Sequence, residues 1–355
     1  METTEKRYNH LNLIKFTKDL LHKYGLPADR AKVMAEILIE ADLMGHTTHG
    51  LQMIALYVRE LINGGMKLEG DPKVLNDTGS VISWDGNYLP GPWLVRKAMD
   101  LAVERLDSHS VVTMTIQQSH HIGCLAAYPE ILTKKGLIMI LSCSDPRNKT
   151  VAPFGGVTGV YSPNPLAAGF PTESDPIIFD ISMSTTSNSL LMRLNKENKN
   201  LGHPWLLSAE GELTEETKLF FEDPPATILP LGSLDVGYKG FALGILVEAL
   251  TNALGGFGRS DNPNRWGASV FMQVINPEAF GGLDHFKKEM QYFKERSVAS
   301  KPLHPGEHVR LPGQKALELK REQIKSGVVL HPSVMNVLNE LQDEFSVELP
   351  DPIDK

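Results

Sequence analysis

Residues 45–50 read Gly-His-Thr-Thr-His-Gly and lie between two segments whose apolar residues recur at helical spacing. This pattern predicts that one helix ends at Gly45 and another begins beyond Gly50, with a hydroxyl beside a histidine at the junction. Histidine has an unperturbed pKa of about 6.5, and a helix start offers backbone N–H groups to a polar ligand. The hinge is therefore a candidate for proton-transfer chemistry.

A second histidine cluster, Ser-His-His-Ile-Gly at residues 119–123, occupies a similar boundary. It follows a buried strand that the apolar run 111–116 predicts, and it precedes a helix containing Pro129. Two hinges of this kind in one chain predict an active site assembled from separate segments.

Composition excludes several classes of protein. The 355 residues are 41% hydrophobic and 22% charged, which is typical of a globular chain with two or three packed units. The net charge is -8 and no basic block occurs, so the sequence argues against a nucleic-acid partner. Residues 1–9 are polar and the apolar run 241–247 ends at Glu248, so we expect no membrane segment and a cytoplasmic protein. Cys124 and Cys143 lack CxxC spacing and are expected to be reduced, packed thiols.

Periodicity outlines the remaining elements. Helices are predicted at residues 13–24, 33–44, 51–62, 95–106 and 240–254, and strands at 81–84, 111–116, 137–141, 177–181 and 269–275. The helix at 240–254 is apolar enough to be predicted as buried, and the polar stretch 195–223 is predicted as irregular. Hydroxyl side chains at residues 182–189 follow a strand and are suited to holding a phosphate.

Several common motifs are absent from the sequence. No GxGxxG follows a strand, because the glycines at residues 255–258 follow a helix, so an ordinary Rossmann domain is not expected. GxxxxGK[ST] and HExxH are also missing. His120 and His121 have no carboxylate or cysteine at ligand spacing beside them, so we expect no metal site.

A resemblance rests on six motifs taken in order. They are GHTTHGL at residues 45–51, SHHIG at 119–123, VAPFGG at 151–156, PNP at 163–165, FD at 179–180 and GYKG at 237–240. In this order the chain resembles the malate/L-lactate/sulfolactate dehydrogenase family, over residues 10–335, and its hydroxycarboxylate dehydrogenase members most of all. The resemblance implies an NAD(P)-dependent oxidoreductase that interconverts small 2-hydroxy and 2-oxo acids.

The same resemblance implies the architecture. We expect an α/β fold with a mixed, partly antiparallel sheet flanked by helices, unlike a Rossmann fold, and an N-terminal helical region. The units expected are a substrate and dimerisation region at 1–75, an NAD(P)-binding core at 76–300, and a C-terminal helical segment at 301–355 that packs back on the first region. A homodimer with its active site near the subunit boundary is also implied.

Individual roles follow from the matched motifs. His49 and His121 are the implied proton-transfer residues, with a slight preference for His121 as acceptor, and Thr48 is the hydroxyl that orients substrate or cofactor. Gln52 and Met53 are the implied substrate contacts. The implied cofactor contacts are Ser144, Asp180, Ile181, Ser182, Lys239 and Gly313. The match weakens beyond Asp180, which leaves both NAD and NADP open.

One departure from the family signature concerns the substrate. The signature is Asp-Ser-His-Gly with an arginine four residues after the histidine, whereas here Thr47 stands at the acid position and Met53 at the arginine position. The family arginine is taken to hold the substrate carboxylate, and a thioether cannot replace that ion pair. A bulkier substrate than malate or lactate is therefore expected. The alternatives are a cyclic imine reductase of the piperideine-2-carboxylate type and a dinucleotide-binding relative without catalysis.

Overall fold

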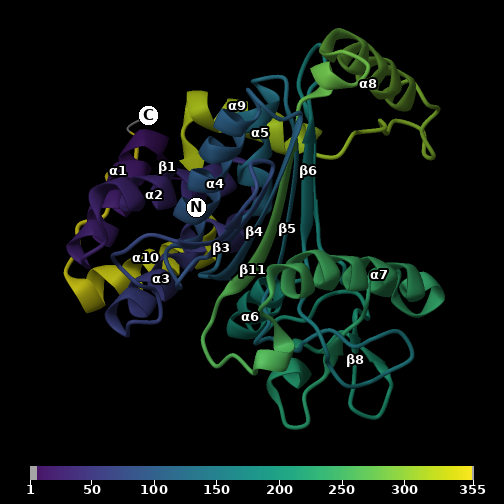
Figure 1. Ribbon diagram of the computed structural model, residues 1–355. Helices are drawn as coiled ribbons and strands as arrows, with labels where there is room; N and C mark the ends of the chain where they lie inside the picture. Colours follow the sequence, from purple (N-terminus) through teal and green to yellow (C-terminus); the bar gives the residue numbers. More distant parts are fainter. Residues whose placement is uncertain (1–5, 354–355) are drawn as a thin grey trace.

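The computed structural model describes residues 6–353, and a seven-stranded sheet forms its centre (Figure 1). In spatial order the strands are β2 (Lys73–Asp77), β3 (Val81–Asp85), β4 (Val111–Ser119), β11 (Ala268–Ile275), β5 (Ile138–Ser144), β6 (Leu166–Phe170) and β7 (Ile177–Ile181). β3 and β4 pair in parallel, and every other neighbouring pair in this sheet is antiparallel. The expectation of a mixed, partly antiparallel α/β sheet is confirmed.

Helices cover the sheet and extend from its ends. They are α1 (His10–Lys23), α2 (Ala28–Leu43), α3 (Ile54–Ile62), α4 (Gly91–Arg105), α5 (Pro129–Thr133), α6 (Asn188–Lys196), α7 (Ser233–Glu248), α8 (Leu283–Val298), α9 (Gln314–Ser326) and α10 (Pro332–Phe345). The N-terminal helices end where the sequence predicts. Asn9 caps α1 by accepting the N–H groups of Leu11 and Asn12, and Gly25 follows the helix with a φ of +90°. Among the described residues, no helix is long and apolar enough to cross a membrane.

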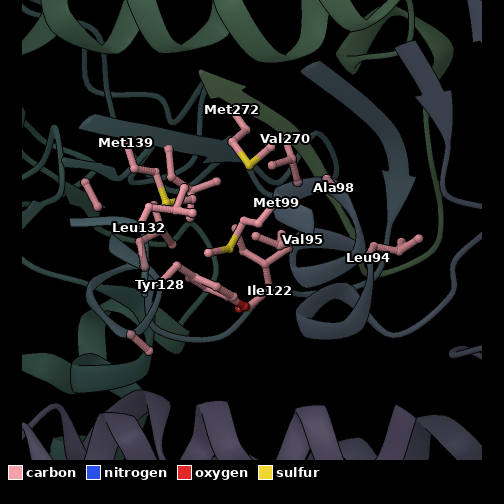
Figure 2. Close-up of a cluster of buried hydrophobic side chains, with 14 of the residues drawn as sticks. Leu94, Val95, Ala98, Met99, Ile122, Tyr128, Leu132, Met139, Val270 and Met272 are labelled. Carbon is pink, nitrogen blue, oxygen red and sulfur yellow. The ribbon is translucent and has the colours of Figure 1, made fainter. Parts of the chain in front are cut away.

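α4 supplies much of the core against the sheet, because it makes the crossover between the parallel strands β3 and β4. Figure 2 shows Val95 and Met99 of this helix beside Met139 of β5 and Met272 of β11. All four side chains are at most 1% exposed. Their burial fixes the helix against the middle of the sheet.

A second core joins the two ends of the chain. Leu13 and Leu38 from the first helices pack in one cluster with Tyr57 of α3 and with Leu338 and Leu341 of α10. The short strands β1 (Arg7–Tyr8) and β12 (Val328–Val329) pair beside this cluster, and Figure 1 shows α10 lying next to α3. The C-terminal helix therefore helps to hold the segment on which the first histidine hinge sits.

Two expectations about the elements need correction. The stretch 195–223 is not wholly irregular, since β8 (Leu206–Leu207) and β9 (Leu213–Thr214) form a small sheet with β10 (Thr227–Ile228). The apolar segment 240–254 is helical as predicted, and it consists of the end of α7 and a following π-helical turn (Ala249–Ala253). The prediction that this segment is buried was wrong for the single chain. Leu243, Ile245, Leu246 and Leu254 are 38–57% exposed. The helix is apolar on several sides, and this chain covers only part of that surface.

Candidate functional site

The first histidine hinge is built from two short 3-10 helices between α2 and α3, η1 (Thr47–His49) and η2 (Leu51–Met53). Asp42, at the end of α2, accepts the N–H of Leu51 at 2.7 Å. A Cβ at Gly50 would lie 2.3 Å from Oδ1 of the same carboxylate, so only glycine allows this close approach. Burial raises the pKa of Asp42 to about 7, against its ordinary value of 3.8. Asp42 thus fixes the backbone of the hinge at Gly50 and Leu51.

The second hinge, at the end of β4, brings His121 to the first one. The rings of His49 and His121 stack with their centroids 5.9 Å apart and an angle of 20° between their planes. The neighbouring His120 is fully buried and its Nε2 lies 3.2 Å from Glu60. The two histidines singled out as proton-transfer residues therefore lie together, although 72 positions separate them in the sequence.

Two defined donors face Nδ1 of His121. The hydroxyl of Tyr57 lies 2.7 Å from this nitrogen, and the backbone N–H of Gly123 lies 3.3 Å from it. Because an amide N–H only donates, Nδ1 is the acceptor, and the neutral ring carries its hydrogen on Nε2. Trp266 stacks on the ring, with centroids 5.0 Å apart. Sequence reasoning missed Tyr57 and Trp266, although a tyrosine inside an apolar helical stripe signals a buried hydroxyl that needs a partner.

Both histidines are held in the neutral form. Loss of hydration, followed by the nearby His46, lowers the pKa of His49 to about 4. Loss of hydration also brings the pKa of His121 well below its usual value, and His49 and His120 add to this effect. The side chain of Thr48 contacts the first ring, with Oγ1 3.0 Å from Nδ1 of His49. A neutral imidazole is the form that can accept a proton, and both rings are in this form at pH 7.

The two residues expected to contact substrate differ in their surroundings. Met53 is 3% exposed and packs in the cluster that the N-terminal helices share with α10. Gln52 is half-buried, and its Oε1 accepts a hydrogen bond from the hydroxyl of Ser333 at the start of α10, at 3.2 Å. On the other side of the hinge, Arg193 of α6 donates from Nη1 to Oγ1 of Thr47 at 3.0 Å. Nothing in the local sequence around Arg193 indicated this contact.

Asp180 connects β7 to the loop after the second hinge. Its Oδ2 accepts the N–H of Ala126 at 2.9 Å and lies 3.7 Å from the thiol of Cys124. Burial raises its pKa, although His46 and the hydrogen bond from Ala126 oppose that rise. The next residue, Ile181, is 42% exposed, and the hydroxyl of Ser182 donates to the carbonyl of Ser184 at 2.9 Å. Asp180 thus links β7 to the backbone of Ala126, in the loop that follows the second hinge.

The chain that follows β7 has polar atoms available to a ligand. Oγ1 of Thr186 and Oδ1 of Asn188 are buried and have no hydrogen-bond partner within the described residues. Buried polar atoms in this state cost free energy unless a ligand or water satisfies them. The hydroxyl-rich run from Ser182 to the start of α6 therefore fits a polar ligand such as the phosphate and sugar of a dinucleotide.

The other three expected cofactor contacts lie in different settings. Ser144 is fully buried, and its hydroxyl donates to Glu248 at 2.8 Å and accepts from Arg259 at 2.9 Å, so this side chain belongs to an internal polar network. Lys239 is exposed on α7, with Nζ 5.9 Å from the centre of the Tyr238 ring. A Cβ at Gly313 would lie 2.4 Å from the carbonyl oxygen of Ile178, so close packing on β7 accounts for this glycine. The recorded contacts of these three residues do not include the histidine hinges.

Between Lys6 and Ile353, no group of three or more histidine, cysteine, aspartate or glutamate side chains is placed to hold a metal ion. The stacked rings of His49 and His121 belong to no such group in that part of the chain. The structure is thus a mixed α/β sheet that carries a pair of stacked histidines between two hinges, and it lacks the dinucleotide-binding motif of a Rossmann domain.

Comparison with known proteins agrees with this class, and the chain is an oxidoreductase. The family model described as malate/L-lactate dehydrogenase matches residues 8–339, and the chain belongs to that family. It is 29% identical to the malate dehydrogenase of Pyrococcus abyssi over 97% of this chain and 98% of the relative. It is 29% identical to the L-lactate dehydrogenase of Cupriavidus necator over 95% of this chain and 97% of that relative.

The solved structure of malate dehydrogenase from Pyrococcus horikoshii OT3 superimposes with a TM-score of 0.86. The two chains are 26% identical, and the match covers 98% of this chain and 97% of the other. The family membership that the six motifs suggested is confirmed, and the fold is that of the family's dehydrogenases.

Proposed function

We propose that this protein interconverts a 2-hydroxy acid and the corresponding 2-oxo acid, with NAD or NADP as cofactor. The observation that carries the proposal is the stacked pair of neutral histidines, His49 and His121, at 5.9 Å. Oxidation of an alcohol needs a base for the hydroxyl proton and a donor that steadies the oxygen as the carbonyl forms. Two neutral imidazoles in contact offer both functions.

The hydrogen bonds around the rings support a division of roles. Nδ1 of His121 already accepts from Tyr57 and Gly123, so its Nε2–H is the free donor toward the substrate oxygen. His49 can donate from Nδ1 to Oγ1 of Thr48, which leaves the lone pair of Nε2 to take the proton. We therefore assign proton acceptance to His49, in place of the initial preference for His121, and Thr48 orients its ring.

The residues after β7 are proposed to hold the cofactor. When bound, a nicotinamide takes hydride from the substrate carbon or returns it. Ser182, Thr186 and Asn188 offer hydroxyl and amide groups to its polar parts, and Ile181 offers an exposed apolar side chain. Asp180 positions this segment through Ala126. Lys239, Gly313 and Ser144 remain proposed contacts, although the hydroxyl of Ser144 is already bonded to Glu248 and Arg259.

The substrate is proposed to lie between the histidines and the start of α10. Gln52 is half-buried and is oriented by Ser333, so its amide N–H₂ group is placed to donate to a substrate oxygen. Its neighbour Met53 packs in the apolar cluster and contributes no charge of its own to the site. An acid with a larger side chain than malate or lactate suits such a wall.

A homodimer is part of the proposal. Leu243, Ile245 and Leu246 leave exposed apolar side chains on more than one side of α7, which a monomeric protein rarely presents to water. We assign this surface to a second copy of the chain. We further propose units at 1–75, 76–300 and 301–355, because the N-terminal helices and α10 share one core while α7 lies apart from it.

A panel of 2-oxo acids, together with a cyclic imine carboxylate, tests the reaction with NADH and with NADPH. We expect loss of the reduced-nicotinamide absorbance with at least one 2-oxo acid. His49→Ala and His121→Ala should each lower kcat by about 100-fold or more, since general acid–base catalysis contributes typically 10²–10⁴-fold. His308→Ala, at an exposed position, is the matched control. Reduction of the imine alone would point to the imine reductase, and dinucleotide binding without any turnover would point to a non-catalytic relative.

A further inference from the structure

Arg193 joins α6 to the first histidine hinge across 146 positions of sequence. Its Nη1 donates to Oγ1 of Thr47, at 3.0 Å, and Thr47 is two residues from His49. The side chain is half-buried. A cation is therefore held at the edge of the proposed active site by a contact with the hinge itself.

The acid nearest to Arg193 along α6 is Glu197, whose pKa is lowered first by its hydrogen bond with Lys199 and also by the charge of Arg193. In the part of the chain that the structure describes, Arg193 forms no ion pair, while the other basic residues nearby do. Lys196, one turn further along α6, pairs with Glu340 at 2.5 Å, and Lys199 pairs with Glu197 at 2.8 Å. Arginine has five N–H donors, and the contact with Thr47 uses one of them. The remaining donors and the positive charge are available to an anion.

The start of α10 also lies within reach of the charge of Arg193. His331 precedes α10, and its Nδ1 accepts the backbone N–H of Ser333 at 3.2 Å, while the hydroxyl of Ser333 donates to Gln52. Loss of hydration and the charge of Arg193 both lower the pKa of His331, so the guanidinium also acts toward the start of α10. The hinge, α6 and the start of α10 thus converge at one place, and the cation lies at their junction.

We propose that Arg193 binds the carboxylate of the substrate. The inference rests on the proposed 2-hydroxy acid reaction and names the group that holds the acid. A guanidinium matches a carboxylate with two parallel hydrogen bonds, which a lysine cannot do. Met53 supplies no charge at the signature's arginine position, and Thr47, unlike the signature's aspartate, supplies no carboxylate that would compete for Arg193. The anion-binding function has moved from η2 to α6.

Variants of Arg193 test the proposal on the full-length protein. Arg193→Met should raise KM for the best 2-oxo acid, and the Kd for oxamate, an inert 2-oxo acid analogue, by about 10- to 100-fold, as expected for loss of a charged hydrogen bond. For Arg193→Lys, both KM and the Kd for oxamate should lie between the values of the parent protein and those of Arg193→Met. The dinucleotide Kd should stay within about twofold. Lys196→Met, on the same helix but paired with Glu340, is the matched control and should leave all three quantities unchanged.

Substitutions at Thr47 give an independent test that leaves Arg193 in place. Thr47→Asp introduces a carboxylate beside the guanidinium, because Oγ1 of Thr47 now lies 3.0 Å from Nη1 of Arg193. This variant should raise the Kd for oxamate about as much as Arg193→Met does. Thr47→Asn keeps an oxygen acceptor without the charge and should have a much smaller effect. Because Thr47 is at a partly exposed position, both variants are expected to fold.

The outcomes separate this inference from the proposed function. Unchanged oxamate affinity in Arg193→Met, or equal effects of the two Thr47 variants, overturns the assignment. A selective loss of dinucleotide affinity in Arg193→Met also overturns it and places Arg193 at the cofactor. If the parent protein turns over no 2-oxo acid but binds oxamate in a manner that depends on Arg193, the carboxylate site stands and the proposed reaction falls.

Discussion

The hydroxyl of Tyr57 lies 2.7 Å from Nδ1 of His121, and no part of the tyrosine is exposed to solvent. Burial raises the pKa of Tyr57 above its usual value of 10, so the phenol keeps its proton at any pH at which the protein works. With the N–H of Gly123 on the same nitrogen, the hydroxyl donates to the ring and favours the neutral tautomer that has hydrogen on Nε2. We propose that Tyr57 positions the ring of His121 and acts through it.

Tyr57→Phe should therefore raise the pKa of His121, because the hydroxyl stabilises the neutral ring and the phenylalanine does not. We expect kcat to fall by about fivefold, since one oriented hydrogen bond is worth roughly 1 kcal/mol. A pH titration of the histidine NMR signals, with the pH dependence of kcat, measures both effects. Tyr24→Phe provides a control hydroxyl deletion elsewhere. An unchanged titration of His121 would show that the tautomer is fixed by Gly123 alone.

Much of the fold could be predicted from local patterns, because helical and alternating periodicities reflect which face of each element is buried. The pairing of β4 with β11 could not, since it joins strands about 150 residues apart and no local signal records it. The apolar character of α7 predicted a buried helix, but Leu243, Ile245 and Leu246 are exposed, because an apolar sequence does not tell whether the same chain covers it. The fold class itself came from the order of motifs.

The candidate site likewise contains some residues that local sequence predicts and others that only the fold reveals. His49 and His121 stand in motifs and were found from sequence, whereas Asp42, Tyr57 and Arg193 act through contacts with other segments. Asp42 and Tyr57 lie in apolar helical stripes, where a polar residue suggests a buried partner without naming it. Arg193 lies on a polar helix that looks like ordinary surface. Only the folded structure shows that its side chain reaches Thr47.

Gly50→Ala should destabilise the protein and lower activity together. The new Cβ would lie 2.3 Å from Oδ1 of Asp42, which is buried and fixed by Leu51, so the hinge must shift. Overpacking of this kind costs about 1–3 kcal/mol. Urea denaturation and kcat measure the two effects. Gly255→Ala is the matched control, because its Cβ would have Thr115 at 4.0 Å as nearest neighbour, and it should be neutral or slightly stabilising. Equal midpoints for both variants would contradict the close contact.

Asp42 should make stability depend on pH in a defined direction. Its pKa is raised from 3.8 to about 7, so the folded state binds the proton more tightly than the unfolded state. This contribution to stability is present in full below pH 4 and is lost as the pH rises through about 7, by up to about 4 kcal/mol at 1.36 kcal/mol per pKa unit.

Asp42→Asn removes this titration. The Tm of the variant relative to the parent should therefore increase between pH 4.5 and pH 8, and thermal unfolding followed by circular dichroism measures the difference. Asp100→Asn, at an exposed position on α4, controls for the change in net charge. A difference between Asp42→Asn and the parent that stays constant over this pH range would show that Asp42 does not carry the effect.

Ile245→Glu should convert the proposed dimer into a monomer. Ile245 is 53% exposed on α7 between other exposed apolar residues, and burying an unpaired carboxylate at an interface is costly. Sedimentation velocity at several concentrations measures the oligomeric state. Leu303→Glu, at a position that is 88% exposed and far from α7 in sequence, is the control and should leave the oligomer intact. A parent protein that sediments as a monomer would remove the dimer from the proposal. A dimer that survives Ile245→Glu would move the interface away from α7.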